Sequence, residues 1–160
     1  MTKAESSNTH QPEARPEDVA TLDAIVTAMY ESISGPKGDR DWDRIRSLHL
    51  PGSHLIPTGV RANGEIGLRV LDIEGWIDGA RPLFEENDFY EVEVSRHTDR
   101  FGNIAQAFST YECRWEENGP AFMRGINSIQ LLKKDGRWWV VCVFWDNETE
   151  DNLIPEQFLP

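Results

Sequence analysis

The sequence predicts an α+β domain in which helices from the N-terminal half cover one face of an antiparallel sheet from the C-terminal half. Two observations predict this class. Apolar residues recur at steps of three and four in the first third of the chain, and they alternate with polar residues in its second half. A chain of 160 residues with 39% hydrophobic residues is consistent with one domain.

The chain divides into three parts by composition. Residues 1–15 are small and polar and predict a disordered leader. Residues 16–147 carry the periodic apolar pattern and are expected to form the single domain. Residues 148–160 are polar at first and end with Ile154, Phe158 and Leu159, so we expect this tail to pack back on the domain or on a dimer.

Three helices are expected before the meander. The first begins at Pro16 and ends before Gly35-Pro36, because proline suits a first helical position and Gly-Pro stops a helix. The second spans about residues 42–48, with Asp41 as its cap. Asp72 is expected to cap the third, although two glycines and a proline weaken that prediction.

The remaining segments predict strands. Asn63-Gly64 lies between two short extended runs and is typical of a hairpin. From Phe89 onward four extended segments follow one another, with turn residues between them, and they predict an antiparallel meander. The last turn, Asp135-Gly136, is expected to place Lys134 opposite Arg137.

Counting outward from that turn assigns side chains to the two faces of the sheet. An uninterrupted register places Asn127 on one face with the even-numbered residues of the last strand, and a single bulge would exchange the faces. We expect the first face to meet the helices and to line a pocket. Its predicted ligand-binding residues, with two from the helices, are Trp42, Trp76, Phe108, Trp138 and Phe144.

The other face would leave an apolar surface of several hundred Å² exposed unless something covers it. A second copy of the chain is the simplest cover, so the sequence predicts a homodimer through the outer sheet face. The alternative is that residues 154–159 fold back across it. The residues predicted for the interface are Tyr111, Arg124, Gln130, Trp139, Val141, Val143 and Trp145.

Charge and motifs exclude several classes of function. The 16 basic and 28 acidic residues give a net charge of −12, which disfavours nucleic acid and anionic membranes as partners. The N-terminal residues lack the apolar segment of a secretory signal, and Cys113 and Cys142 lack a CxxC spacing, so a cytoplasmic protein with free thiols is expected. No metal-binding or nucleotide-binding motif occurs, and no cofactor is expected.

The segments FGNIAQAFSTYECRW, RGINSIQLLKKDGRWW and VFWDNETEDNLIP resemble the nuclear transport factor 2-like superfamily, and its SnoaL-like and ketosteroid-isomerase-like members in particular. The resemblance covers about residues 17–147. It implies a cone-shaped, cystatin-like fold whose curved sheet wraps around three helices and encloses a pocket, and bacterial members of unassigned function are the most similar. The superfamily contains isomerases, dehydratases and cyclases as well as non-catalytic modules.

Comparison with ketosteroid isomerase implies four candidate catalytic residues. Tyr30, late in the first helix, and Asn127, on the meander, stand near its two hydrogen-bond donors. No carboxylate stands where its base should follow the second helix, so His54 or Glu112 would have to serve. For Glu112, a structural ion pair with Arg114 or Arg96 is the alternative.

Two classes of function therefore fit the sequence. The first is a protein that binds a hydrophobic small molecule, with cofactor-free acid–base chemistry by an isomerase, cyclase or dehydratase. The second is a non-catalytic binding or dimerisation module whose cone is filled by its own side chains.

Overall fold

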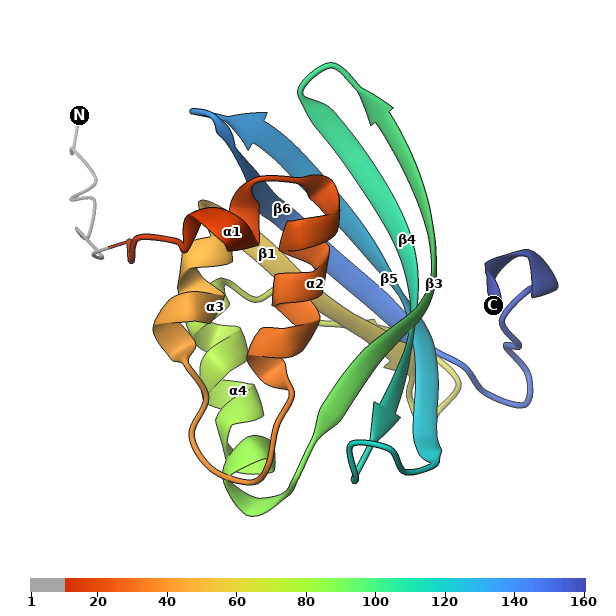
Figure 1. The fold of residues 1–160 in the computed structure, drawn as a ribbon. Coiled ribbons are helices and arrows are strands. Elements are labelled where there is room, and N and C mark those ends of the chain that lie inside the picture. Colours follow the sequence, from red (N-terminus) through yellow and green to blue (C-terminus); the bar gives the residue numbers. More distant parts are fainter. Residues whose placement is uncertain (1–10) are drawn as a thin grey trace, which may run out of the picture.

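A computed structural model describes residues 11–160, which form four α-helices, one six-stranded sheet and a final 3-10 turn (Figure 1). All four helices lie on one face of the sheet, which we call the inner face. The elements in chain order are α1 (Pro16–Val19), α2 (Leu22–Ile33), α3 (Trp42–Leu48), β1 (His49–Val60), β2 (Ile66–Leu68), α4 (Ile73–Glu86), β3 (Tyr90–Phe101), β4 (Ile104–Arg114), β5 (Ala121–Lys134), β6 (Arg137–Asn147) and η1 (Glu156–Phe158).

The α+β class is confirmed, and the helices begin near the predicted caps. Asp41 and Asp72 accept hydrogen bonds from the backbone N–H groups of Arg44 and Gly75, at 2.9 and 2.8 Å. The predicted first helix is divided, because Thr21 is extended and its hydroxyl caps α2 by accepting from the N–H of Ala24 at 3.0 Å. A threonine hydroxyl that accepts from a backbone N–H group in this way favours the start of a helix over its interior.

The sheet has the order β2-β1-β6-β5-β4-β3. The β1–β2 hairpin around Asn63-Gly64 and the four-stranded meander are present as predicted. The sheet is mixed where an antiparallel one was predicted, because β1 pairs with β6 in parallel. This pairing brings the start of β1, directly after α3, against the middle of β6.

The register of β5 and β6 follows the prediction for the four pairs nearest the turn and differs in the remaining six. Asp135 and Gly136 have positive φ angles of 54° and 77°, and Lys134 pairs with Arg137 as expected. Beyond the Leu131–Val140 pair, one extra residue of β6 forms a bulge, and Gln130 then pairs with Cys142. The bulge exchanges the faces of all the following residues.

The face assignments on β6 are therefore corrected beyond the bulge. Trp138 faces the helices and is 2% exposed, as predicted. Val143 and Trp145, predicted for the dimer interface, instead line an inner cavity. Phe144, predicted to line the pocket, lies on the outer face and is 47% exposed.

The assignments on β4 are also corrected. Ser109 pairs with Asn127, and Tyr111 with Gly125, so the odd-numbered residues of β4 face inward. Tyr111, predicted for the interface, is buried against the cavity. Phe108 and Glu112, predicted for the pocket, point to the outer face, because a register shift near Cys113 changes the count across the turn that joins β4 to β5.

The C-terminal segment lies against the outer face (Figure 1). The hydroxyl of Thr110 donates to the carbonyl oxygen of Phe158 at 2.7 Å, and the Phe158 ring lies 5.0 Å from that of Phe108. Thr110 is thereby 1% exposed although it points away from the helices. The tail thus covers part of the face that the sequence assigned to a second copy.

The predicted leader of residues 1–15 lies partly outside the described residues, since 1–10 are not described. Within residues 11–15, Gln11 donates to the carbonyl oxygens of Arg46 and His49, at 2.7 and 3.2 Å. Arg15 forms an ion pair of 2.9 Å with Asp41. Gln11 and Arg15 therefore contact the domain, and Ala14 packs against its core. None of the helices in the described part of the chain is long and apolar enough to cross a membrane.

Candidate functional site

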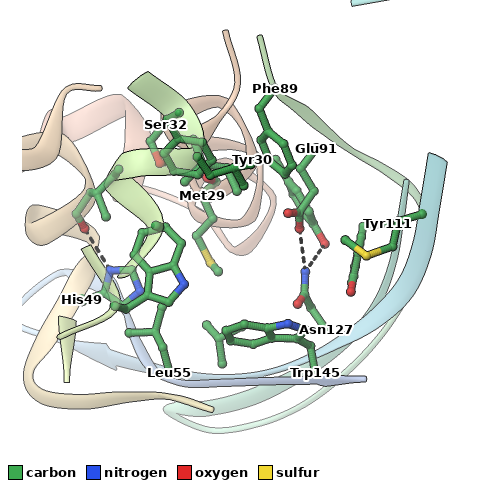
Figure 2. Close-up of a pocket in the computed structure, with 18 residues that line it drawn as sticks. Met29, Tyr30, Ser32, His49, Leu55, Phe89, Glu91, Tyr111, Asn127 and Trp145 are labelled. Carbon is green, nitrogen blue, oxygen red and sulfur yellow. Dashed lines mark hydrogen bonds between the residues drawn. The ribbon is translucent and has the colours of Figure 1, made fainter. Parts of the chain in front are cut away.

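A cavity of about 210 Å³ lies between the helices and the inner face of the sheet (Figure 2). Residues from α2, α3, α4 and all strands except β2 contribute to it. Most of its lining is apolar or aromatic, and the polar exceptions stand out. The lining residues are Met29, Tyr30, Ser32, Ile33, Ile45, His49, Leu55, Trp76, Ala80, Leu83, Phe84, Phe89, Glu91, Tyr111, Met123, Asn127, Val143 and Trp145.

Glu91 is the acidic residue of this lining. It lies near the start of β3 two residues after the buried Phe89, and alternate residues of a strand share a face. Its Oε1 accepts a hydrogen bond of 3.1 Å from Asn127 Nδ2, and the Cys113 thiol lies 3.9 Å from its Oε2. Burial raises the pKa of Glu91 to about 7, against the smaller lowering effect of the Asn127 hydrogen bond.

Tyr30 and Asn127 belong to a directed chain of hydrogen bonds. Asn127 Nδ2 donates to the Tyr30 hydroxyl at 3.1 Å, which leaves the Tyr30 proton to bond Ser109 Oγ at 2.7 Å. Ser109 in turn donates to Glu93 Oε2. The chain ends at the 3.2 Å ion pair between Glu93 and Arg96. The Tyr30 proton is therefore already engaged within the protein.

This series of hydrogen bonds also determines whether Asn127 has an N–H group free to bind a ligand. One of its N–H groups is engaged with Tyr30 and the other with Glu91. Burial and the nearby Glu91 carboxyl raise the pKa of Tyr30 well above the usual range of a phenol, so its hydroxyl stays protonated. Tyr30 and Asn127 thus hold Glu91 in position, and neither has a free donor for an oxyanion.

Tyr111 and Cys113 of β4 lie beside Glu91, and of these two Tyr111 lines the cavity. Tyr111 is 2% exposed and its hydroxyl donates to Asn147 Oδ1. Its ring packs over Gly125, whose missing side chain makes room for it. Burial is the main cause that raises the pKa of the Tyr111 hydroxyl and of the Cys113 thiol, and both therefore stay uncharged around Glu91 at neutral pH.

His49 lies on the opposite side of the cavity from Glu91, Asn127 and Tyr111 (Figure 2). It is the first residue of β1 and is 4% exposed. Its Nδ1 lies 2.9 Å from the carbonyl oxygen of Ile45 at the end of α3. His49 directly follows α3, and the sequence around it carries no pattern that would place its side chain in a pocket.

The structure brings together two of the four predicted catalytic residues, Tyr30 and Asn127. His54 and Glu112, the two alternatives predicted for the base, do not line this pocket. His54 is exposed on β1, and the outward-facing Glu112 forms an ion pair of 2.7 Å with Arg114. The structural ion pair that the sequence left open for Glu112 is thus present.

Of the predicted ligand-binding residues, Trp76 lines the cavity. Trp42 and Trp138 are buried in the core, at 8% and 2% exposure, without lining it. Phe108 and Phe144 lie on the outer face, as described above. Among the predicted interface residues, Tyr111, Val143 and Trp145 line the cavity, whereas Arg124, Gln130, Trp139 and Val141 do not.

Glu91 was overlooked because its segment alternates Glu with Val, which is typical of a half-exposed strand. In the structure the glutamates of this strand take part in the inner network and the valines do not. The large apolar residue at position 89 could have shown this, since Phe89 and Glu91 must share a face. Within residues 11–160, no group of three or more His, Cys, Asp or Glu side chains is placed to hold a metal ion.

The fold is that of nuclear transport factor 2-like, cystatin-like proteins, as comparison with solved structures shows. A Nostoc punctiforme protein of unknown function with a cystatin-like fold matches at a TM-score of 0.61 and 11% identity, over 81% of this chain and 90% of its own. A nuclear transport factor 2-like protein of unknown function from Silicibacter pomeroyi matches at 0.56 and 19%, over 81% and 94%.

A third structure, described as a putative calcium/calmodulin dependent protein kinase II association domain from Xanthomonas campestris, matches at a TM-score of 0.57 and 17% identity, over 81% of this chain and 86% of its own. At these identities the likeness concerns the fold and carries no activity across. No protein-family model matches the sequence, and no curated protein matches it.

Proposed function

We propose that this protein binds a hydrophobic small molecule in the cavity and that Glu91 exchanges a proton with it, in the manner of a cofactor-free isomerase, cyclase or dehydratase. The observation that carries the proposal is a carboxyl group with a pKa of about 7 in the wall of a largely apolar cavity. Such a group is present in both protonation states at neutral pH and can act as acid or as base.

The size of the cavity restricts the ligand. A cavity of roughly 150 Å³ lined by apolar side chains accommodates benzene. At about 210 Å³ the cavity fits a molecule of one or two rings better than a four-ring steroid. This volume also favours binding over the alternative of a cone filled by its own side chains.

The test is a thermal-shift screen of bicyclic aromatic and terpenoid compounds at pH 6.5. A ligand at 100 times its Kd adds about 2.7 kcal/mol to the free energy of unfolding. As a control we choose Ala80→Phe, which adds a ring to a cavity-lining position of α4. We expect wild type to be stabilised and this variant not to respond. Failure of every apolar compound to stabilise wild type would contradict the proposal.

Proton exchange separates the catalytic part of the proposal from binding alone. 2-Tetralone is a bicyclic ketone, and an ionised Glu91 would remove one of its α-protons to give the enolate, which then takes up deuterium from D2O. We expect Glu91→Gln to bind 2-tetralone and to lose at least tenfold of the protein-dependent exchange rate, measured by proton NMR. Equal exchange rates in wild type and Glu91→Gln would mean that the protein binds the ketone without proton transfer by Glu91.

We also propose that two copies pair through the outer face. Two exposed apolar side chains support this, Phe144 of β6 at 47% exposure and Leu153 of the C-terminal segment at 70%. One structure of the same fold is described as an association domain. Sedimentation equilibrium at micromolar concentration should give twice the chain mass of 18.3 kDa, and Phe144→Glu should give the single mass. A wild-type protein of single mass would contradict the pairing.

A further inference from the structure

The imidazole of His49 has one engaged and one free nitrogen. Its Nδ1 lies 2.9 Å from the Ile45 carbonyl oxygen, which can only accept a hydrogen bond, so Nδ1 carries a proton and donates it. Burial lowers the pKa of His49 to about 4, and the ring is neutral at pH 7. Nε2 is therefore a lone-pair acceptor.

This acceptor has no partner within residues 11–160. Nε2 is buried, and no group of the described chain donates a hydrogen bond to it. The whole residue is 4% exposed, and it belongs to the lining of the cavity. Because Nδ1 points to the end of α3, Nε2 is turned away from that helix. A buried polar atom without a partner is costly, so a ligand hydroxyl that displaces the side chains around Nε2 and donates to it recovers that cost.

The two sides of the cavity carry different polar groups and would therefore bind different parts of a ligand. Glu91 and Asn127 form the polar side, and His49 stands across from them (Figure 2). Between them the lining is apolar, with Leu55 and Trp145 among the residues that contribute to it. A ligand that fits this arrangement carries a hydroxyl donor at the His49 end of an apolar body, and the other end of that body lies against Glu91.

We propose that the ligand is an aromatic or alicyclic alcohol whose hydroxyl group donates a hydrogen bond to His49 Nε2 while its apolar body extends toward Glu91. This inference rests on the proposed function, since it names the substrate class of the same cavity. It goes beyond acid–base chemistry because His49 supplies a fixed acceptor and no proton. A plain hydrocarbon or an ether of the same size would leave Nε2 unpaired.

The test compares 2-naphthol with 2-methylnaphthalene, in which a methyl group replaces the hydroxyl. Their Kd values are measured by calorimetry on wild type, His49→Phe and the control His54→Phe, because His54 is exposed on β1 and does not line the cavity. We expect the preference for the naphthol over the hydrocarbon to fall about tenfold in His49→Phe and to stay unchanged in His54→Phe. A preference that persists in His49→Phe would overturn the inference.

A measurement on wild type keeps the test independent of the folding of the variant. The ¹⁵N shift of His49 Nε2 should move upfield when 2-naphthol binds, because an acceptor nitrogen shifts in that direction on hydrogen bonding, and it should move little with 2-methylnaphthalene. If both compounds bind and neither moves this shift, the inference fails and the proposed function stands. If neither compound binds and the screen also finds no ligand, both fail.

Discussion

Glu91→Gln should raise the free energy of unfolding by about 3 kcal/mol relative to wild type at pH 8.5 and change it little at pH 4. The cause is the cost of burying a charge. Folding raises the pKa of Glu91 from 4.5 to about 7, and each unit of difference corresponds to about 1.4 kcal/mol. Glutamine keeps the shape and the hydrogen-bonding capacity of the protonated acid.

The direction of this effect follows from proton binding. Between pH 4.5 and 7 the folded state holds a proton on Glu91 that the unfolded state has released. Stability from this group is therefore fully present below pH 4.5 and is lost as the pH rises through 7. Asn127, Tyr30, Tyr111 and Cys113 surround the carboxyl, and among these four no side chain is cationic to offset its charge.

Urea denaturation of the two proteins at several pH values between 4 and 9 measures the difference directly. Glu86→Gln is a matched control, because Glu86 is exposed at the end of α4. We expect the control to follow wild type across the range. A difference between wild type and Glu91→Gln that stays constant with pH would contradict a raised pKa.

Gly125→Ala should destabilise the protein by about 3 kcal/mol, since added atoms in a packed site force backbone and side-chain shifts. A methyl group at position 125 would lie 2.5 Å from the backbone oxygen of Asp146 and 2.6 Å from Tyr111 Cζ. Tyr111 cannot yield easily, because its hydroxyl is bonded to Asn147 and its ring is buried in the cavity wall. The substitution therefore deforms the site as well as the sheet.

Gly79→Ala provides the contrasting control. Gly79 lies inside α4, and an added methyl group meets nothing within 4 Å. Alanine is favoured over glycine in a helix by up to about 1 kcal/mol, so this variant should be slightly more stable than wild type. Thermal and urea unfolding of both variants check the pair. Equal stabilities for the two variants would contradict the close packing of Tyr111 on Gly125.

Local signals in the sequence predicted most of the elements. The caps Asp41 and Asp72 and the Asp135-Gly136 turn each act within a few residues, and all three are present in the structure. The parallel pairing of β1 with β6 was not predictable in this way. Its partners, such as His54 and Cys142, are far apart in sequence, and no turn fixes their alignment.

The candidate site depended on the least predictable feature, the register. One bulge in β6 moved Trp145 into the cavity and Phe144 out of it. Nothing in the run RWWVVCVFW marks where that bulge falls, because residues on both faces are apolar. Tyr30 and Asn127 were identified by resemblance, and Glu91 and His49 emerged only from the folded arrangement.

The acid–base role of the cavity depends on Glu91 being near half-protonation at neutral pH. An NMR titration of the Glu91 side-chain carboxyl carbon, assigned by comparison with Glu91→Gln, measures this directly. We expect a midpoint of about 7. A midpoint near the ordinary value of 4.5 would contradict it and would remove the acid–base role from this site.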